Sequence, residues 1–416
     1  MRGRRSRQCN LNHLRGLRLI PFLRSAFTMK RISQSPTDPA FVQNPYPTYA
    51  RVRADSPLAY WEAYDMVAAL SYDTVRTALR DKRMGREIPA ELAASIPDHL
   101  APFYKIEAHS MLELEPPTHT RLRSQVLRAF TSRRIAALGP EIEGLAIDLI
   151  NRFPQNEPFD LLTHFAKPLP VIIIARLLGV PDTDADQLLA WSNAMVAMYQ
   201  ANRTRQIEEA ASAAALAFTT YMQDIVAAKR QSPSDDLIST LIAATDAGDG
   251  LSMDELITTC ILLLNAGHEA TVHTIGNSTK TLLETGHRDI TDACVEELLR
   301  FDPPLHLFVR HVYEDVTLGG QTLKRGDKIA CMLGAANRDP AAYPNPDTFD
   351  PTRPIKQNTS FGGGIHFCVG APLARLELKI ALSTLFAHCP SLRLTAPPRY
   401  ADIYHFHGLE RLMVQT

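Results

Sequence analysis

Apolar residues recur at helical spacing over most of the chain. Between residues 118 and 232 they return every three or four positions, with breaks at prolines. A second helical pattern runs from Ser252 to about residue 283, and Ser252 with Glu255 forms the sequence of a capping box at its start. A helix of roughly 30 residues is unusually long for a globular protein. Shorter helical patterns cover residues 48–55, 292–301 and 372–388.

Strand patterns are short and gather in two parts of the chain. Residues 58–61 and 66–70 predict two strands near the N-terminus. Residues 316–323 predict a hairpin that turns at the two glycines in its middle, and residues 328–333 predict a further strand. The chain has neither internal repeats nor a low-complexity linker. We therefore expect one large, mainly α domain with a smaller β-rich region.

Length and composition exclude several classes of protein. The 416 residues are 45% hydrophobic and 21% charged, so disordered, collagen-like and small disulfide-rich chains do not fit. The net charge of -1 argues against a dedicated nucleic-acid-binding protein. No apolar run approaches the roughly 20 residues that a membrane-spanning helix requires. We expect neither nucleic acid nor a membrane among the partners.

The charge is unevenly distributed along the chain. Residues 1–31 hold nine of the 44 basic residues and none of the 45 acidic ones, so the remainder is acidic. Such a segment is typical of an organellar transit peptide, of a basic tail, or of a start codon placed upstream of the true one at Met29. We favour the third interpretation because the segment lacks helical amphipathicity. We expect residues 1–31 to be a leader that is disordered or outside the true start, and residues 32–416 to form a single domain.

Six cysteines are scattered along the chain, and no pair has the spacing of a zinc site. A disulfide framework is not expected either. Free cysteines of this kind fit a reducing cytoplasm. Cys368 differs from the others because it follows a glycine-rich loop and precedes a predicted helix. Backbone N–H groups and the helix dipole can stabilise a thiolate there, and the glycines let a flat ligand approach the backbone. The alternative is that Cys368 is a small buried apolar residue, as isolated cysteines commonly are.

The segment 361–370, FGGGIHFCVG, decides between these interpretations. It resembles the haem-binding loop FxxGxxxCxG of the cytochrome P450 superfamily, a spacing that chance produces very rarely. The resemblance implies a cytochrome P450 fold, in which haem b (iron protoporphyrin IX) lies between the long distal helix and the proximal helix that follows the Cys loop. Residues 32–416 would then be a haem-thiolate catalytic domain with Cys368 as the iron ligand. The other cofactor-binding residues implied in this loop are Phe361, Gly362, His366 and Gly370.

Glu297 and Arg300 match the ExxR motif of the same family and lie three residues apart on one predicted helix face. A buried pair of this kind requires further hydrogen-bond partners. In the family the third partner is an arginine of a later FDPxR segment, and Arg353 of FDPTR occupies that position here. The resemblance implies a structural role for these three residues.

Four basic residues match positions that hold the haem propionates in the family. His119 and Arg123 are four residues apart in the segment 116–130 and so share a helix face. Arg310 and His366 correspond to two further propionate partners. Arginine suits this role because its guanidinium binds a carboxylate through two hydrogen bonds.

The long helix carries AGHEAT at residues 266–271, similar to the oxygen-activation motif of the family. The resemblance implies a catalytic region in which Gly267 lets dioxygen and substrate approach the helix and Glu269 relays protons. Ala270 stands where the family usually has threonine, and Thr271 is rotated by about 100° around the helix. In family members with alanine at this position, a substrate hydroxyl or an ordered water is thought to replace the missing hydroxyl.

The resemblance implies a bacterial-type haem-thiolate monooxygenase that inserts one oxygen atom from O2 into a mainly apolar small organic substrate, by hydroxylation or epoxidation. No flavin or iron–sulfur module follows, so we expect electrons from a separate ferredoxin and its NAD(P)H-dependent reductase. Arg121 and Arg128, on the helix face opposite His119, are either solvated or form a basic docking surface for that donor. We expect a cytoplasmic monomer.

Two other functions stay open. One is a haem-thiolate enzyme that is driven by peroxide or rearranges its substrate. The missing threonine favours it, whereas family peroxygenases usually carry an arginine in the distal helix and residues 253–283 contain none. The other is a haem-binding sensor or carrier without turnover. By the same resemblance, the walls of the substrate pocket are expected from the distal helix and from residues 85–110, 190–205, 305–309 and 405–409.

Overall fold

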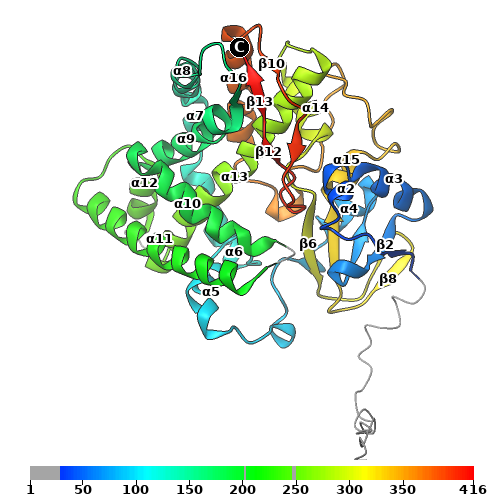
Figure 1. The fold of residues 1–416 in the computed structure, drawn as a ribbon. Helices are drawn as coiled ribbons and strands as arrows, with labels where there is room; N and C mark the ends of the chain where they lie inside the picture. The colour runs from blue at the N-terminus through cyan, green and yellow to red at the C-terminus, as the bar shows by residue number, and fades with distance from the viewer. Residues whose placement is uncertain (1–28, 201–202, 246–249) are drawn as a thin grey trace, which may run out of the picture.

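The computed structural model describes residues 29–200, 203–245 and 250–416. It is mainly helical, and its main sheet lies to one side together with the N-terminal helices (Figure 1). The predicted mainly α chain with a smaller β-rich region is therefore confirmed. The helices beside the sheet are α2 (Pro39–Gln43), α3 (Tyr46–Asp55), α4 (Tyr72–Ala78) and α15 (Leu333–Asn337). The other helices are α5 (Ala101–Glu107), α6 (Thr118–Ala129), α7 (Ser132–Ala137), α8 (Gly139–Ile150), α9 (Pro168–Leu178), α10 (Ala185–Val196), α11 (Arg205–Gln231), α12 (Leu237–Ala244), α13 (Met253–Thr285), α14 (Asp292–Phe301) and α16 (Ala371–His388).

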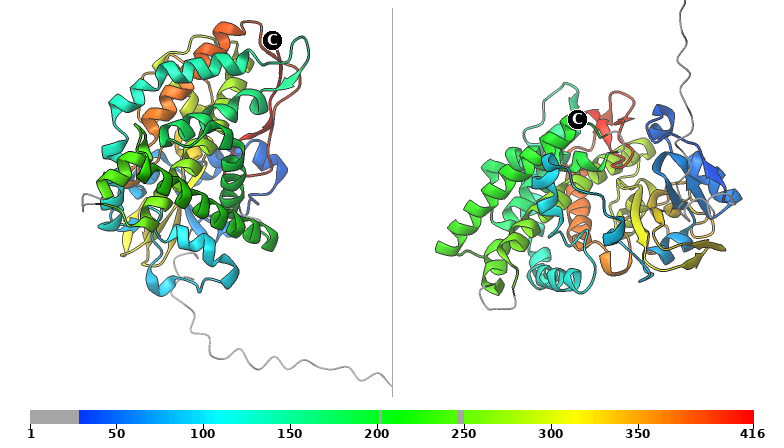
Figure 2. Two further views of the ribbon diagram at one scale, coloured as in Figure 1. Left: turned by 90° about the vertical axis from the view of Figure 1, so that its left-hand side faces the viewer. Right: turned by 90° about the horizontal axis from the view of Figure 1, so that it is seen from below.

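The 33-residue helix α13 forms the centre of the helical part. Ser252 accepts a hydrogen bond from the Glu255 N–H at 3.2 Å, and Glu255 accepts one from the Ser252 N–H at 2.8 Å, which confirms the predicted capping box. Helices α9, α11 and α16 pack against α13 and bury most of its length. Seen from below, α16 lies between the helical layer and the sheet (Figure 2).

The main sheet joins strands from distant parts of the chain in the order β1-β2-β3-β9-β6-β4. Strands β2 and β3 form the predicted N-terminal pair, β3 runs parallel to β9, and β6 lies antiparallel to β9. The predicted hairpin is confirmed as β7 and β8. The sequence pattern did not predict β6, the strand that carries Arg310. The strands are β1 (Arg31–Ile32), β2 (Leu58–Trp61), β3 (Met66–Ala69), β4 (Met84–Gly85), β5 (Phe159–Asp160), β6 (Leu307–Val312), β7 (Val316–Leu318), β8 (Gln321–Leu323), β9 (Lys328–Met332), β10 (Arg393–Leu394), β11 (Arg399–Tyr400), β12 (Leu409–Arg411) and β13 (Met413–Gln415).

The last residues of the predicted leader belong to the fold. Met29 is buried in the core of the sheet region, and Arg31 lies in β1 opposite Tyr60 of β2. The boundary predicted at residue 31 is therefore corrected, because the burial of Met29 and the pairing of β1 place residues 29–31 with the folded chain. The rest of the predicted leader, 1–28, lies outside the described residues.

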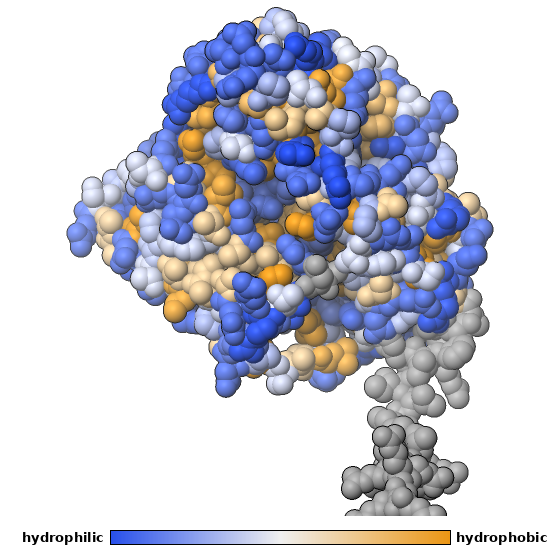
Figure 3. Space-filling model, in the orientation of Figure 1, coloured by the Kyte–Doolittle hydropathy of each residue, from blue (hydrophilic) through white to orange (hydrophobic). Residues whose placement is uncertain are grey.

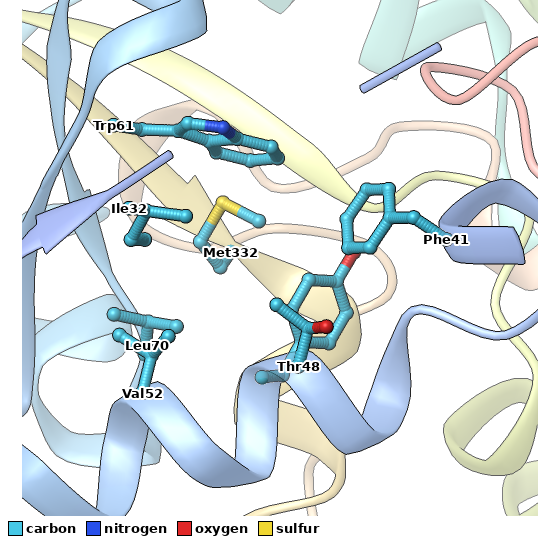
Figure 4. Close-up of a pocket in the computed structure, with 8 residues that line it drawn as sticks. Ile32, Phe41, Thr48, Val52, Trp61, Leu70 and Met332 are labelled. Carbon is cyan, nitrogen blue, oxygen red and sulfur yellow. The ribbon is translucent and has the colours of Figure 1, made fainter. Parts of the chain in front are cut away.

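The core of the sheet region is closely packed. A void of about 10 Å³ lies between α3 and the sheet (Figure 4), and its walls are almost entirely apolar. A space of this size holds at most one water molecule and offers it no polar partners, so it is not a ligand site. The face in Figure 3 is mostly hydrophilic and is hollowed near its middle. None of the helices in the described part of the chain is long and apolar enough to cross a membrane.

Candidate active site

Cys368 lies in the loop between a 3-10 turn at Gly364–His366 and α16. Its backbone N–H donates to the Phe361 carbonyl at 3.0 Å, which closes the loop. Gly362 has a φ of 70°, and a Cβ at this position would lie 2.9 Å from the Phe308 ring, so both the backbone and the space require glycine. The loop residues named by the sequence therefore fix the place of the thiol.

The Cys368 side chain is accessible even though protein closely surrounds it. Burial raises the pKa of this thiol, whereas hydrogen bonds from the Gly370 and Ala371 N–H groups and the charges of Arg123 and Arg375 act in the opposite direction. The two N–H groups stand at the start of α16, as the sequence predicted. This environment suits a thiol that becomes a thiolate when a metal ion supplies the compensating charge.

Three of the predicted propionate partners meet beside the Cys loop. Arg123 of α6 donates to the Phe367 carbonyl at 2.5 Å. The rings of His119 and His366 lie 4.3 Å apart, and His366 Nε2 is 3.0 Å from Glu115 Oε1. Burial, together with the nearby charges of His366 and Arg123, lowers the pKa of His119 to about 4. His119 is thus a neutral donor or acceptor whose buried Nδ1 has no partner within the described chain.

The fourth partner, Arg310, reaches this region from β6. Its side chain is almost fully buried and donates to the Val309 carbonyl at 2.9 Å, but it forms no ion pair with any described residue. Burial lowers the pKa of Arg310, and the charge of Glu115 only partly offsets this effect. A buried guanidinium that lacks a carboxylate partner requires an anion.

One stripe of α13 is accessible although the helix runs through the middle of the molecule. Ala266 is exposed, and Leu262 and Ala270 are half-buried. A spacing of four residues places all three on one helix face, which therefore borders an interior space. Thr271 is buried and lies about 100° around the helix from Ala270, so it is off this stripe, and its hydroxyl donates to the Gly267 carbonyl at 3.2 Å. The accessible stripe of α13 therefore carries alanine at position 270 and no threonine hydroxyl.

These observations fit a haem. The accessible Cys368 thiol offers one iron ligand, and the accessible stripe of α13 offers an apolar surface for a flat macrocycle. Glu115 contacts His366 of the basic set, and Glu113 is paired with Arg86, so two propionates would supply negative charge that Arg310 lacks. The residues that would hold the propionates are His119, Arg123, Arg310 and His366.

Gly267 has a neighbour that the sequence did not predict. A Cβ at this position would lie 2.9 Å from Ile174 of α9. Glycine at 267 therefore allows α9 and α13 to pack closely. Its expected role in admitting dioxygen and substrate stays a prediction.

Glu269 lies between two histidines of the same helix. His268 Nε2 is 3.5 Å from Glu269 Oε2, and His273 Nε2 is 3.4 Å from Glu269 Oε1. Burial opposes ionisation of Glu269, but the two histidines outweigh it and hold the pKa of the carboxyl below its usual range. His273 was not among the residues predicted for the site, although its spacing of four residues from Glu269 was a usable signal.

The structure brings Glu297, Arg300 and Arg353 together in a buried network. Arg300 donates to both Glu297 oxygens at 2.7 Å, and Arg353 Nε donates to Glu297 Oε2 at 3.2 Å. Glu297 also accepts from the Asp350 N–H at 2.9 Å, and Arg300 donates to the Asn337 carbonyl at 2.9 Å. The network ties α14 to the segment before the Cys loop, as a structural role requires.

Three of the predicted pocket-wall segments meet at a polar cluster. The Tyr199 ring stacks on His405 at 5.9 Å, and its hydroxyl donates to Glu107 at 3.3 Å. Arg86 forms an ion pair with Glu113 next to them. Burial, reinforced by the charge of Glu113, raises the pKa of Glu107 to about 7. The sequence predicted these segments but not the polar character of their meeting point.

Arg121 has a partner within the fold. Its Nη1 lies 3.1 Å from Glu255 Oε2, and the pair ties α6 to the first turn of α13. Arg128 is exposed. Arg121 and Arg128 were expected either to be solvated or to form a docking surface on α6, and Arg121 forms an ion pair within the fold.

A mainly helical chain that combines an accessible cysteine thiol at the start of a helix with a partly buried set of propionate-type donors defines a haem-thiolate protein. Comparison with known proteins makes this class specific. Residues 276–391 match the model of the cytochrome P450 family. The chain is 37% identical over 400 residues to cytochrome P450 107B1 of Saccharopolyspora erythraea, with 91% of this chain and 96% of that protein covered. The chain belongs to the cytochrome P450 family.

Two further relatives support this assignment. Vitamin D(3) 25-hydroxylase of Pseudonocardia autotrophica is 39% identical over 372 residues, which cover 85% of this chain and 88% of that protein. The solved structure of P450BioI in complex with a hexadec-9Z-enoic acid ligated acyl carrier protein superposes with a TM-score of 0.85 at 32% identity, covering 90% of this chain and 99% of that one. The protein is accordingly an oxygen-incorporating oxidoreductase of the P450 monooxygenase class with a haem cofactor.

Proposed function

We propose that residues 29–416 form a cytoplasmic, monomeric monooxygenase that holds haem b and oxidises a mainly apolar small organic molecule by hydroxylation or epoxidation. A separate ferredoxin and its NAD(P)H-dependent reductase provide the electrons. For hydroxylation, the substrate RH, O2, two electrons and two protons give ROH and water. The observation that carries the proposal is the accessible Cys368 thiol beside a partly buried set of basic side chains.

The Cys loop and the basic set hold the cofactor in this proposal. A bound haem would supply oxygen activation, with a thiolate as its iron ligand. Cys368 provides that thiolate, and the Gly370 and Ala371 N–H groups stabilise its charge. Phe361 and Gly362 shape the loop, and Arg375 lies over the Phe361 ring at 4.6 Å.

The accessible stripe of α13 faces the substrate in this proposal. Glu269 moves protons toward the reacting oxygen in this proposal, and the flanking histidines favour its ionised form, so a proton that reaches it is readily passed on. Ala270 offers no hydroxyl, and the Thr271 hydroxyl is bound to the Gly267 carbonyl. A substrate hydroxyl or a water molecule therefore takes the place of a threonine hydroxyl, and we expect the substrate to carry a hydroxyl near the oxidised carbon.

The substrate is mainly apolar with at least one polar group. One relative is named vitamin D(3) 25-hydroxylase, and a similar solved structure, that of P450BioI, is a complex with acyl carrier protein ligated to hexadec-9Z-enoic acid; both molecules are mainly apolar. The cluster of Glu107, Tyr199 and His405 would meet the polar part of such a molecule where the pocket walls join. The free described cysteines support the cytoplasmic location, because that compartment keeps thiols reduced.

Spectroscopy of the haem-loaded protein tests the proposed ligand. The reduced carbon monoxide complex should show the red-shifted Soret band of a thiolate-ligated haem, and Cys368→Ala should abolish that band. Cys389→Ala is a matched control, because Cys389 is a buried free cysteine at the other end of α16. A thiolate spectrum that persists in Cys368→Ala contradicts the assignment.

Product analysis separates the proposal from its alternatives. Product formed only with NAD(P)H and the two redox partners supports the monooxygenase. Product formed equally well with peroxide alone supports a peroxide-driven enzyme, and the absence of product under both conditions supports a sensor or carrier. Substrates are found by screening a compound library for loss of the low-spin Soret band.

A further inference from the structure

Polar side chains follow one face of α13 away from the proposed oxygen site. Glu269, His273, Asn277 and Lys280 are spaced by four, four and three residues, so they lie in a row along the helix. This row meets the C-terminal loop, where the Asn277 side chain donates to the His407 carbonyl at 2.8 Å. We call these residues, together with Asp302, the α13 polar row.

Asp302 forms the outer end of the row. Lys280 Nζ lies 3.0 Å from its Oδ2, Tyr46 donates to its Oδ1 at 3.2 Å, and the Tyr400 hydroxyl donates to its Oδ2. His407 Nε2 is 3.7 Å from Asp302 Oδ1 and its ring stacks on Tyr400. Lys280 keeps 13% of its side chain exposed, while Asp302 keeps 4%. This end of the row therefore reaches solvent through Lys280.

The middle of the row contains polar atoms that lack partners. In the described part of the chain, eleven buried side-chain nitrogen and oxygen atoms have no hydrogen-bond partner, and five of them lie together here. Buried polar atoms in proteins are almost always satisfied by protein or by ordered water, and a water requires two to four polar neighbours. The atoms are His273 Nδ1, Asn277 Oδ1, His306 Nε2, His407 Nδ1 and His407 Nε2.

His273 joins this region to Glu269. Its Nε2 faces Glu269 Oε1, and its Nδ1 is one of the unpartnered atoms. Gly408 allows this arrangement, since a Cβ at 408 would overlap the His273 ring. An imidazole with one nitrogen toward each side can accept a proton at Nδ1 and release one from Nε2. His268 cannot do so, because its Nδ1 is bound to the Leu264 carbonyl at 2.7 Å.

We propose that the α13 polar row is a hydrated proton relay that carries protons from Lys280 and Asp302 through His407 to His273 and on to Glu269. The proposal rests on the proposed monooxygenase function, in which each turnover consumes two protons. Water molecules bridge the gap of 3.7 Å between Asp302 and His407 and the step from His407 to His273, whose charges act on each other. The relay gives Glu269 a proton source inside the protein. Ala270 has no hydroxyl and cannot pass protons.

His273→Gln tests the relay in the holoenzyme. Glutamine keeps a polar side chain but cannot take a proton on one nitrogen while releasing it from another. We expect product per NAD(P)H to fall about tenfold with peroxide released instead, and the solvent isotope effect in D2O to change. Tyr49→Phe is the matched control, because Tyr49 belongs to the same buried cluster but bonds to His306 at 2.8 Å and to Tyr404, off the route. It should leave both quantities within about twofold.

A second measurement reads the relay without turnover. Nitrogen-15 spectra of the histidines in the ferrous carbon monoxide complex, which is diamagnetic, report the protonation of each ring. Asp302→Asn should shift the nitrogen-15 signals of His407 and of His273 together, whereas Tyr49→Phe should shift neither. Thermal unfolding of each variant shows whether a loss reflects instability.

The outcomes are distinct. A His273→Gln enzyme that is fully coupled with a wild-type isotope effect overturns the relay, and so does an Asp302→Asn spectrum in which His273 keeps its wild-type nitrogen-15 signals. A wild-type enzyme that forms no product with its redox partners contradicts the proposed function instead. In that case the joint change of the His407 and His273 nitrogen-15 signals still decides whether the two rings are linked.

Discussion

Replacing Glu297 by glutamine should strongly destabilise the protein while leaving its shape almost unchanged. Glu297 accepts four hydrogen bonds, two from Arg300 and one each from Arg353 and the Asp350 N–H. Both members of the central pair keep only 2% of their side chains exposed. The variant therefore leaves a buried guanidinium facing an uncharged amide, and it turns an NH2 donor toward other donors.

The size of the effect follows from burial. Removing one partner of a buried ion pair costs about 3–5 kcal/mol, because the remaining charge is neither paired nor solvated. The adjacent residue provides a matched comparison. Glu296 pairs with Arg375, whose side chain is 36% exposed, so Glu296→Gln should cost at most about 1 kcal/mol.

The assay is equilibrium unfolding of the two variants beside the wild type, with the carbon monoxide spectrum recorded before each experiment. We expect Glu297→Gln to unfold at clearly lower denaturant and temperature, and to lose haem more readily, because its network adjoins the segment that leads to the Cys loop. If Glu297→Gln and Glu296→Gln were equally stable, burial of the pair would not be the source of its contribution, and the reasoning would fail.

Three further predictions concern the site. Arg310→Leu should transfer its haem to an apo-globin acceptor at least about tenfold faster, because a buried guanidinium would no longer face the propionates. Unchanged transfer rates would contradict that role. Ala270→Thr should alter the fraction of electrons that reach product, and unchanged coupling would contradict the idea that a substrate hydroxyl replaces threonine. Burial raises the pKa of Glu107 from 4.5 to about 7 in the folded protein. Between pH 4.5 and 7 the folded state therefore holds a proton on Glu107 that the unfolded state has lost, so the free energy of unfolding should fall as the pH rises over this range. Glu107→Gln should flatten this dependence of the melting temperature on pH, and an unchanged slope would contradict it.

Local patterns predicted much of the fold. The capping box at Ser252, the hairpin at 316–323 and the helix at 292–301 depend on residues near one another in the chain, and the structure confirms all three. The sheet could not be predicted in this way. Strand β3 pairs with β9 from the other end of the chain, and only the folded backbone shows that register.

The same distinction holds for the site. The Cys loop is a local motif, so its thiol and glycines followed from the sequence. Contacts between distant segments did not, such as the stacking of Tyr199 on His405 and the approach of Gly408 to His273. The role expected for Gly267 depended on which way a side chain at this position would point. The structure shows that a Cβ there would point toward Ile174.

The parallel pairing of β3 with β9 has a consequence for biosynthesis. Strand β3 ends at Ala69 and β9 begins at Lys328, so about 260 residues separate them. At a synthesis rate of roughly 5–20 residues per second, the N-terminal strands wait about 13–50 s on the ribosome for their partner. During that time the edge of β3 is unpaired and prone to aggregate. Because Cys368 emerges later still, haem capture comes after the sheet closes, and expression at low temperature with a holdase chaperone should raise the yield of holoenzyme.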